Sequence, residues 1–256
     1  MNKKDEDNIS PLVEKLFNNL NEANIVYCLW KGRCDVKKIF RGQDDIDILV
    51  SRHHSSEIQK ELGDMGFKLA APERYSAQTG LMDYFAYDES SGAMIHVQLY
   101  HKLICGDRLS ENIHLPIEEA LLVNRCYDNG IPFLSPESEL SIFIIRKLIQ
   151  NGYIFIRRPH SFIQFIKDLK KEVAFLLSLT TIPSLVEFIQ KELPTIDYIL
   201  LEDAVDLINY EDLNVRNIKS WLVIRKKISS QLSLFMRKSP IANYYDWLLR
   251  RLDIWA

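Results

Sequence analysis

Three aspartates stand at the start of an apolar run and could hold a divalent cation. Asp44, Asp45 and Asp47 introduce residues 46–50, which have the composition of a buried strand. Successive side chains of a strand point to opposite faces, so Asp45 and Asp47 share one face. Adjacent carboxylates repel each other unless a cation or a proton lies between them, and Mg²⁺ takes one or two carboxylates together with phosphate oxygens. The pair predicts a magnesium site, with Asp44 as a turn residue; the alternative is a solvated sheet edge, because such triplets are frequent by chance.

A lysine and a glycine precede these acids. Residues 25–30 (IVYCLW) have the pattern of a short buried strand, and Lys31 and Gly32 follow it directly. Glycine lets backbone amides approach an anion closely, and a lysine beside it supplies a point charge for phosphates. Because residues 45–50 should form a neighbouring strand, we expect a phosphate-binding turn to face the metal site.

The elements that position these residues follow from hydrophobic periodicity and from turn residues. Ser10 and Pro11 begin a helix that runs to about residue 21, and a second helix is capped by Ser55 or Ser56 and ends near residues 63–66. Residues 81–88 and 93–100 flank a short loop with Gly92, which predicts a hairpin. After Ser135 the pattern is almost entirely helical, which predicts five or six helices, over residues 139–152, 162–179, 184–193, 196–208, 215–236 and 244–255.

Four features in this order are similar to the nucleotidyltransferase superfamily: the strand with its Lys-Gly turn, DIDILV, a helix ending in Gly-Phe, and the later strand HVQLY. More narrowly, residues 10–125 resemble the bacterial nucleotidyltransferase-like families, one branch of which occurs fused to a thymidylate-kinase-like domain. The resemblance implies an α+β fold, with a mixed β-sheet and flanking helices that bind a nucleoside triphosphate and Mg²⁺. We expect this domain to cover residues 1–135, followed by an all-α C-terminal helical domain at 136–256.

Residue by residue, the resemblance assigns the phosphate loop to Lys31 and Gly32 and the metal to Asp45 and Asp47. The chain departs from the family at the next loop position, where classical members have serine and this sequence has Arg33. The hydroxyl is replaced by a cation, and Arg33 is therefore expected to contact phosphate as well.

A second departure concerns the carboxylate that activates the acceptor hydroxyl. It should lie on the strand at residues 95–100, where His96, Gln98 and Tyr100 share one face and Gln98 takes the place of the acid. An amide cannot act as a base, which leaves His96 for that role. Asp83 or Asp88, on or next to the hairpin, would supply the missing acid if the strand register places one of them beside Asp47.

These residues lead to three hypotheses. The first is magnesium-dependent transfer of a nucleoside monophosphate from a nucleoside triphosphate to a hydroxyl of an unidentified acceptor, either a small molecule or a protein. The second is a degenerate nucleotidyltransferase fold that binds a ligand, or scaffolds a kinase partner, without turnover. The third is an adaptor that contacts nucleic acid or an anionic membrane through the basic helix at residues 215–238, whose apolar stripe packs on the bundle in the alternative interpretation.

Composition sets broader limits. The chain has 256 residues, 47% of them apolar, and a formal net charge of −3, which argues against a general nucleic-acid binder. No long apolar run or N-terminal leader pattern is present, so we expect a cytoplasmic protein. The cysteines are far apart and read as reduced thiols, without disulfides or a zinc site: Cys28, Cys34, Cys105 and Cys126.

Overall fold

The computed structural model describes residues 9–70, 80–105, 113–150, 159–210 and 215–236. The chain divides into two compact units, and the division does not follow the sequence simply. Unit 1 comprises residues 1–103 and 118–134, and unit 2 comprises residues 104–117 and 135–256. Each unit is considered by itself.

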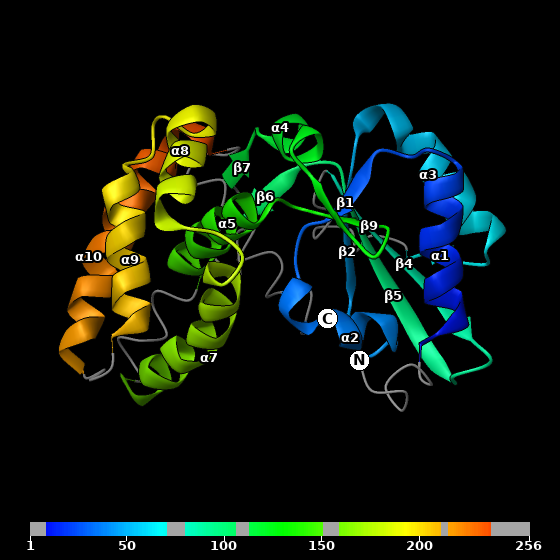
Figure 1. The fold of residues 1–256 in the computed structure, drawn as a ribbon, viewed down its shortest axis with the longest axis horizontal. Helices are drawn as coiled ribbons and strands as arrows, with labels where there is room; N and C mark the ends of the chain where they lie inside the picture. Colours follow the sequence, from blue (N-terminus) through cyan, green and yellow to red (C-terminus); the bar gives the residue numbers. More distant parts are fainter. Residues whose placement is uncertain (1–8, 71–79, 106–112, 151–158, 211–214, 237–256) are drawn as a thin grey trace, which may run out of the picture. The chain divides into compact units, whose positions relative to one another are not determined.

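Unit 1 is built on a mixed seven-stranded sheet flanked by helices (Figure 1). The strands in spatial order are β3 (Lys68–Leu69), β4 (Leu81–Asp88), β5 (Ala93–Tyr100), β2 (Ile46–Val50), β1 (Tyr27–Leu29), β9 (Ile131–Phe133) and β8 (Cys126–Asp128). The β5–β2 and β1–β9 pairs are parallel, and the other pairs are antiparallel. The predicted mixed α/β architecture is confirmed, as is the hairpin of β4 and β5.

One face of this sheet is covered by α1 (Pro11–Glu22) and α3 (Ser55–Asp64), which lie side by side in Figure 1. Short helices lie between β1 and β3: η1 (Arg33–Asp35), α2 (Val36–Phe40) and η2 (Arg52–His54). The helices bury apolar side chains against alternate strand residues, among them Leu16, Leu20, Ile58, Ile48 and Val97. Each such side chain contributes roughly 1.5–3 kcal/mol on burial. The remaining strand residues therefore point to the second face. Helix α4 (Glu118–Val123) contacts β2.

The start of α1 is tied to the far end of the hairpin. Ser10 is the N-cap residue, as predicted, and its Oγ accepts a hydrogen bond from the backbone N–H of Val13. The same hydroxyl donates to Asp88 Oδ2 at 2.5 Å. For the second helix the predicted cap is wrong, because α3 begins at Ser55 and His54 stands at the cap position.

Unit 2 consists mainly of helices: α5 (Pro136–Ile149), α7 (Pro159–Leu177), α8 (Ile182–Glu192), α9 (Tyr198–Asn209), α10 (Val215–Gln231) and η3 (Leu232–Phe235). It also takes in β7 (Ile113–Leu115) and most of β6 (Leu103–Cys105), which form a two-stranded sheet. That residues 136–256 form an all-α domain therefore stays a prediction. The predicted helix at residues 244–255, and the predicted end at Gly152 of the helix over residues 139–152, lie outside the described residues.

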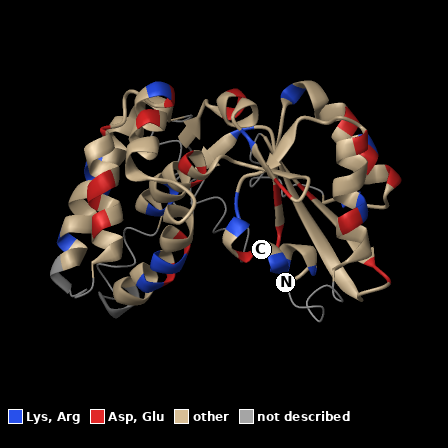
Figure 2. Cartoon of the chain, viewed as in Figure 1, with Lys and Arg blue, Asp and Glu red and all other residues tan. Residues whose placement is uncertain are grey.

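The basic helix α10 buries its apolar stripe. Ile218, Trp221 and Ile228 are buried, and the Trp221 ring makes edge contacts with Phe162 and Phe165 of α7. Figure 2 shows acidic residues along α9 and basic residues on α7 and α10. The stripe is thus used within unit 2, as in the packing interpretation of this helix.

No single helix in the described ranges is long and apolar enough to cross a membrane. Together, Phe162–Leu177 and Ile182–Glu192 have the length and composition of a span, but the two segments are bent by 92° at their break.

Candidate functional site

The strand register brings the predicted site residues together on the second face of the sheet. Gln98 of β5 stands opposite Asp47 of β2 on one side and opposite Asp83 of β4 on the other. These three side chains form one row across three strands. One step along the strands, His96 stands opposite Phe85, and Asp45 immediately precedes β2 on the same side as Asp47.

Lys31 reaches this row from the turn after β1. Its Nζ donates to Asp47 Oδ1 at 2.6 Å and to the Tyr100 hydroxyl at 3.1 Å. The ammonium also lies over two rings, 4.4 Å from the centroid of Trp30 and 4.9 Å from that of Tyr100. The Asp47 side chain is only 12% exposed, so the ammonium supplies the positive charge that a buried carboxylate requires. The expected meeting of the Lys-Gly turn and the Asp-x-Asp strand is therefore present.

His96 links two acids. Its Nδ1 lies 2.8 Å from Asp45 Oδ1, and its Nε2 lies 2.9 Å from Asp83 Oδ1. The imidazole makes both hydrogen bonds as a donor only when both nitrogens carry a proton. The Phe85 ring stacks on the imidazole, with centroids 4.2 Å apart and planes 8° from parallel, which fixes the ring orientation.

Gln98 and Tyr100 join the two halves. The Gln98 amide donates to Asp83 Oδ1 at 3.2 Å, and its carbonyl accepts from the Tyr100 hydroxyl at 2.9 Å. A continuous chain of hydrogen bonds thus runs across the sheet face. We call it the site network, and its members are Asp45, His96, Asp83, Gln98, Tyr100, Lys31 and Asp47.

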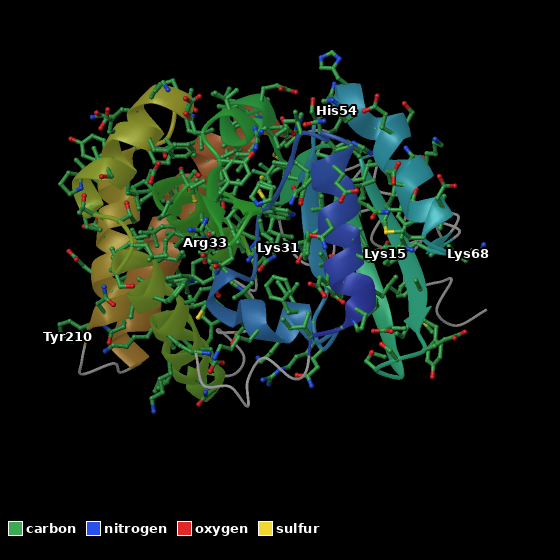
Figure 3. All side chains as sticks on the ribbon, turned by 45° about the vertical axis from the view of Figure 1, so that its right-hand side comes forward. Lys15, Lys31, Arg33, His54, Lys68 and Tyr210 are labelled. Carbon is green, nitrogen blue, oxygen red and sulfur yellow. The ribbon has the colours of Figure 1, made fainter. Side chains whose placement is uncertain are left out.

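Gly32 and Arg33 have distinct positions. Gly32 has a φ of 87°, and a Cβ there would come within 2.9 Å of Ile39 Cδ1, so the turn requires glycine. The Arg33 guanidinium bonds the backbone carbonyl of Leu134 and Cys126 Sγ, and it lies 4.7 Å above the Phe133 ring. Figure 3 shows Lys31 and Arg33 on the same connection. The structure brings Lys31 into the site network and engages Arg33 with the segment around β9.

The two alternative acids have different surroundings. Asp83 belongs to the site network, two strands away from Asp47 rather than beside it. Asp88 is buried near α1 and accepts hydrogen bonds from Ser10, Ser90 and Ser91. Burial acts to raise the pKa of Asp88, but these bonds outweigh burial and hold that pKa well below its usual range. Asp88 therefore anchors the hairpin turn to α1.

Asp45 and Asp47 are the carboxylates of the site network that could take part in a magnesium site together with the phosphate oxygens of a nucleotide. No group of three His, Cys, Asp or Glu side chains with metal-site geometry occurs among the described residues. Two carboxylates on one sheet face, with phosphate oxygens to complete the shell, is a common magnesium arrangement. Asp45 and Asp47 would hold the ion, with their bonds to His96 and Lys31 exchanged for it.

The chain matches no known protein-family model, no curated protein and no solved structure.

Trp30 and Phe85 contribute to this site and were not singled out from the sequence, and Tyr100 was placed on the shared face of its strand without a role. Tyr100 and Phe85 share the strand parity of His96, and this parity was the available signal. Trp30 ends the first strand, and nothing in its spacing distinguishes it from a core residue.

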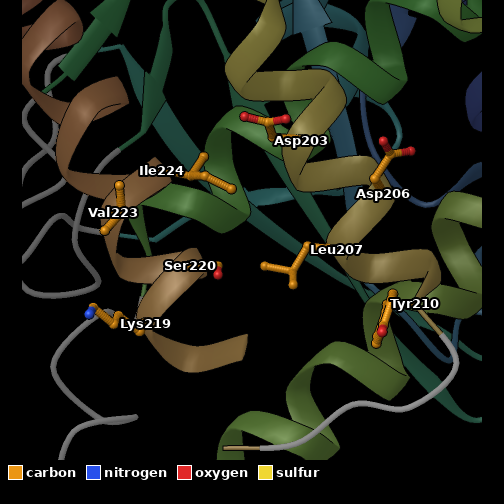
Figure 4. Close-up of a pocket in the computed structure, with 8 residues that line it drawn as sticks. All are labelled: Asp203, Asp206, Leu207, Tyr210, Lys219, Ser220, Val223 and Ile224. Atoms are coloured by element: carbon orange, nitrogen blue, oxygen red, sulfur yellow. The ribbon is translucent and has the colours of Figure 1, made fainter. Parts of the chain in front are cut away.

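Two concave regions lie away from the site network. In unit 2, residues of α9 and α10 line an open groove of about 510 Å³ that includes Asp203, Asp206 and Lys219 (Figure 4). In unit 1, a cavity of about 440 Å³ lies between α1, α2 and the β8–β9 turn, and Phe17 and Phe40 line it. Neither joins any residue of the site network.

Proposed function

We propose that unit 1 binds a nucleoside triphosphate with magnesium and transfers its nucleoside monophosphate to a hydroxyl group. The observation that carries this proposal is the site network. A lysine beside a glycine with a positive φ is bonded to an Asp-x-Asp strand, and side chains connect this pair to a histidine and an acid on the neighbouring strands. Within the proposal, the sheet and its helices are a nucleotidyltransferase-like domain, and residues 136–256 are its helical partner.

Most residues of the network have a role in this scheme. Lys31 and the backbone amide of Gly32 bind phosphate oxygens, and movement of the Lys31 ammonium to phosphate releases Asp47. Asp45 and Asp47 would hold magnesium, which when bound would neutralise the charge of the phosphate oxygens. Arg33 fixes the turn through its bond to the Leu134 carbonyl, and so positions Lys31 without contacting phosphate.

The bond changes balance within the site. The acceptor oxygen bonds to the α-phosphorus while the bond from that phosphorus to the β-phosphate bridging oxygen breaks, and pyrophosphate leaves with the electron pair. Asp83 accepts the proton of the acceptor hydroxyl. His96 orients Asp83 through its Nε2, and Gln98, which cannot take a proton, donates to the same oxygen. In this scheme the acid that the sequence lacks at residue 98 is supplied from the adjacent strand.

The first test is stabilisation by ligand. We expect at least one of the four nucleoside triphosphates to raise the melting temperature with magnesium and not with chelator, because a ligand that binds only the folded state stabilises it. The stabilisation should be lost in the double variant Asp45→Asn/Asp47→Asn.

The matched control is Asp44→Asn/Asp64→Asn, which removes the same charge from two exposed positions of unit 1. It should keep the nucleotide effect. If no nucleotide stabilises the folded wild type, or if the control loses the effect equally, the proposal is wrong.

A binding module without turnover is the second candidate. It is favoured by the amide of Gln98 at the centre of the Asp47–Gln98–Asp83 row. Such a module, alone or as the scaffold for a kinase partner, would show the same metal-dependent stabilisation. It would release no pyrophosphate with any acceptor, whereas the enzyme would release pyrophosphate and would lose that release, but not nucleotide binding, in Asp83→Asn.

A further inference from the structure

An exposed apolar patch continues the site network along the hairpin. Phe85, Tyr87 and Met94 lie on the same face as His96, with relative exposures of 37%, 58% and 59%. Tyr87 stands opposite Met94, and Phe85 stands opposite His96. Their neighbours of the other parity, Tyr84, Ala86 and Ile95, belong to the core. We call Phe85, Tyr87 and Met94 the aromatic patch.

The aromatic patch and Lys31 lie at opposite ends of the network. Along β5 the open-face residues succeed one another as Tyr100, Gln98, His96 and Met94, each about 7 Å from the next. Lys31 contacts Tyr100 at one end of this series, and the patch holds Met94 at the other. In nucleotidyl transfer the attacking and leaving oxygens lie on opposite sides of the α-phosphorus. If Lys31 holds the phosphates that leave, the acceptor approaches from the patch end.

The charges near the patch restrict what can bind there. Strands β4 and β5 carry no lysine or arginine, but Lys68 of β3 stands opposite Phe85. Asp45, with its side chain 52% exposed, and Asp83 border the patch as well. The two carboxylates outnumber the one lysine, so an anionic acceptor such as a nucleic acid or a phosphorylated lipid is disfavoured. Exposed aromatic faces favour a flat ring, which they contact at low entropic cost.

From these observations we propose that the aromatic patch is the acceptor subsite, and that the acceptor is a small, uncharged or cationic hydroxyl compound with a flat aromatic or sugar ring. This inference rests on the proposed nucleotidyl transfer for its role. The ring lies over Tyr87 and Met94, and a hydroxyl of the same molecule points toward Asp83.

Methyl NMR of the full chain labelled with ¹³C-methyl methionine tests the subsite directly. The probe is phenyl β-D-glucopyranoside, which carries both an aromatic and a sugar ring, and Met94→Leu assigns the Met94 signal. We expect a saturable shift of Met94, while Met65 and Met82, which pack against the core, stay unchanged. Phenyl β-D-glucuronide, in which a carboxylate replaces the C6 hydroxymethyl group, should bind at least fivefold more weakly. Benzyl alcohol and methyl β-D-glucopyranoside then show which ring the subsite selects.

Two variants separate the patch from general surface effects. Tyr87→Ser should weaken binding of the glucoside by about fivefold, as expected for the loss of one ring contact. Tyr127→Ser is the matched control, because Tyr127 is also an exposed tyrosine, 60% exposed, on β8 at the far edge of the sheet. It should leave the Met94 titration unchanged.

The remaining outcomes overturn the proposal in different ways. A silent Met94, equal binding of the glucuronide, or equal effects of the two tyrosine variants shows that the patch is no such subsite. A Met94 shift caused by magnesium and a non-hydrolysable triphosphate, with competition by the glucoside, assigns the patch to the nucleobase instead. Concentration-dependent self-association that buries Met94 assigns the patch to an interface. Glucoside binding at Met94 without any nucleotide binding rejects the acceptor role together with the proposed function, yet leaves the ring site itself.

Discussion

At the scale of single residues, Lys31 is the group on which most of the site chemistry depends. Its ammonium lies 2.6 Å from a carboxylate that is almost fully buried, so it stands where a metal cation would balance the same charge. Two cations cannot share that position without repulsion. Magnesium alone should therefore compete poorly with Lys31, whereas magnesium with a nucleotide offers the lysine a phosphate partner.

The variant Lys31→Met tests this competition. We expect its stability in chelator to fall by about 1–3 kcal/mol, because Asp47 loses a charged hydrogen bond, and we expect magnesium alone to restore part of that loss. Wild type should respond little to magnesium without a nucleotide. Chemical denaturation with and without magnesium measures both effects, and Lys60→Met, at an exposed position of α3, is the control. A magnesium response that is the same in all three proteins would contradict the account.

His101 gives a second prediction at this scale. Burial, and to a smaller extent the nearby Arg52, lowers the pKa of His101, whose Nε2 lies 3.3 Å from Ser55 Oγ. Above the unfolded pKa of about 6.5 the imidazole of His101 is neutral in both states. As the pH falls below that value, the unfolded chain takes up a proton that the folded chain resists, so the folded state loses stability. The urea midpoint of wild type should therefore drop more steeply from pH 7.5 to 5.5 than that of His101→Gln. Equal slopes would show that His101 titrates alike in both states.

At the scale of elements, the turn from β1 to η1 places Lys31, and Gly32 shapes that turn. Gly32 and Gly66 have nearly the same φ, 87° and 89°, but of the two only a Cβ at Gly32 would meet another side chain, that of Ile39. The two glycines therefore separate backbone strain from a steric clash.

We expect Gly66→Ala to cost about 1–2 kcal/mol from the left-handed backbone alone. Gly32→Ala should cost more, and it should also abolish the magnesium-nucleotide stabilisation, since the displaced turn moves Lys31. Thermal melts of both variants with and without ligand give the comparison. Retention of the full nucleotide effect in a folded Gly32→Ala variant would argue against a phosphate-binding turn.

Elements with a strong pattern could be predicted from the sequence, and short ones could not. The limits of β4 and β5 follow from the alternation of LMDYFAYD and AMIHVQLY, and α1 follows from its cap and its apolar spacing. Strands β8 and β9 have three residues each, too few for a period to show. The shared face of Asp47 and Gln98 follows from parity, but the bond of Arg33 to the carbonyl of Leu134, about 100 residues away, depends on the pairing of β1 with β9, which no local pattern encodes.

At the scale of the whole molecule, each unit has its own core and its own buried tryptophan. Trp30 lies beside Lys31 in unit 1, and Trp221 lies among the helices of unit 2. All members of the site network belong to unit 1. A ligand of that network should therefore stabilise unit 1 more than unit 2.

Two single-tryptophan chains would show this, one keeping Trp30 and one keeping Trp221, with the other tryptophans changed to phenylalanine. We expect magnesium and nucleotide to raise the fluorescence melting midpoint of the Trp30 chain by more than that of the Trp221 chain. The chelator serves as the control for both. Identical shifts would mean that the two units unfold as one cooperative body.

Because residues 104–117 belong to unit 2, the division into units also affects how the chain folds during synthesis. Because the backbone passes between units after residues 103, 117 and 134, neither unit is one uninterrupted stretch of polypeptide. During synthesis β1 and β2 emerge early, but β9, the other neighbour of β1, emerges about 100 residues later, and the partner of Ile113 at Met236 later still. A gene fragment that stops at residue 134 would therefore encode unit 1 together with residues 104–117, whose contacts lie downstream. Replacing residues 104–117 with a short linker is the better way to isolate the site.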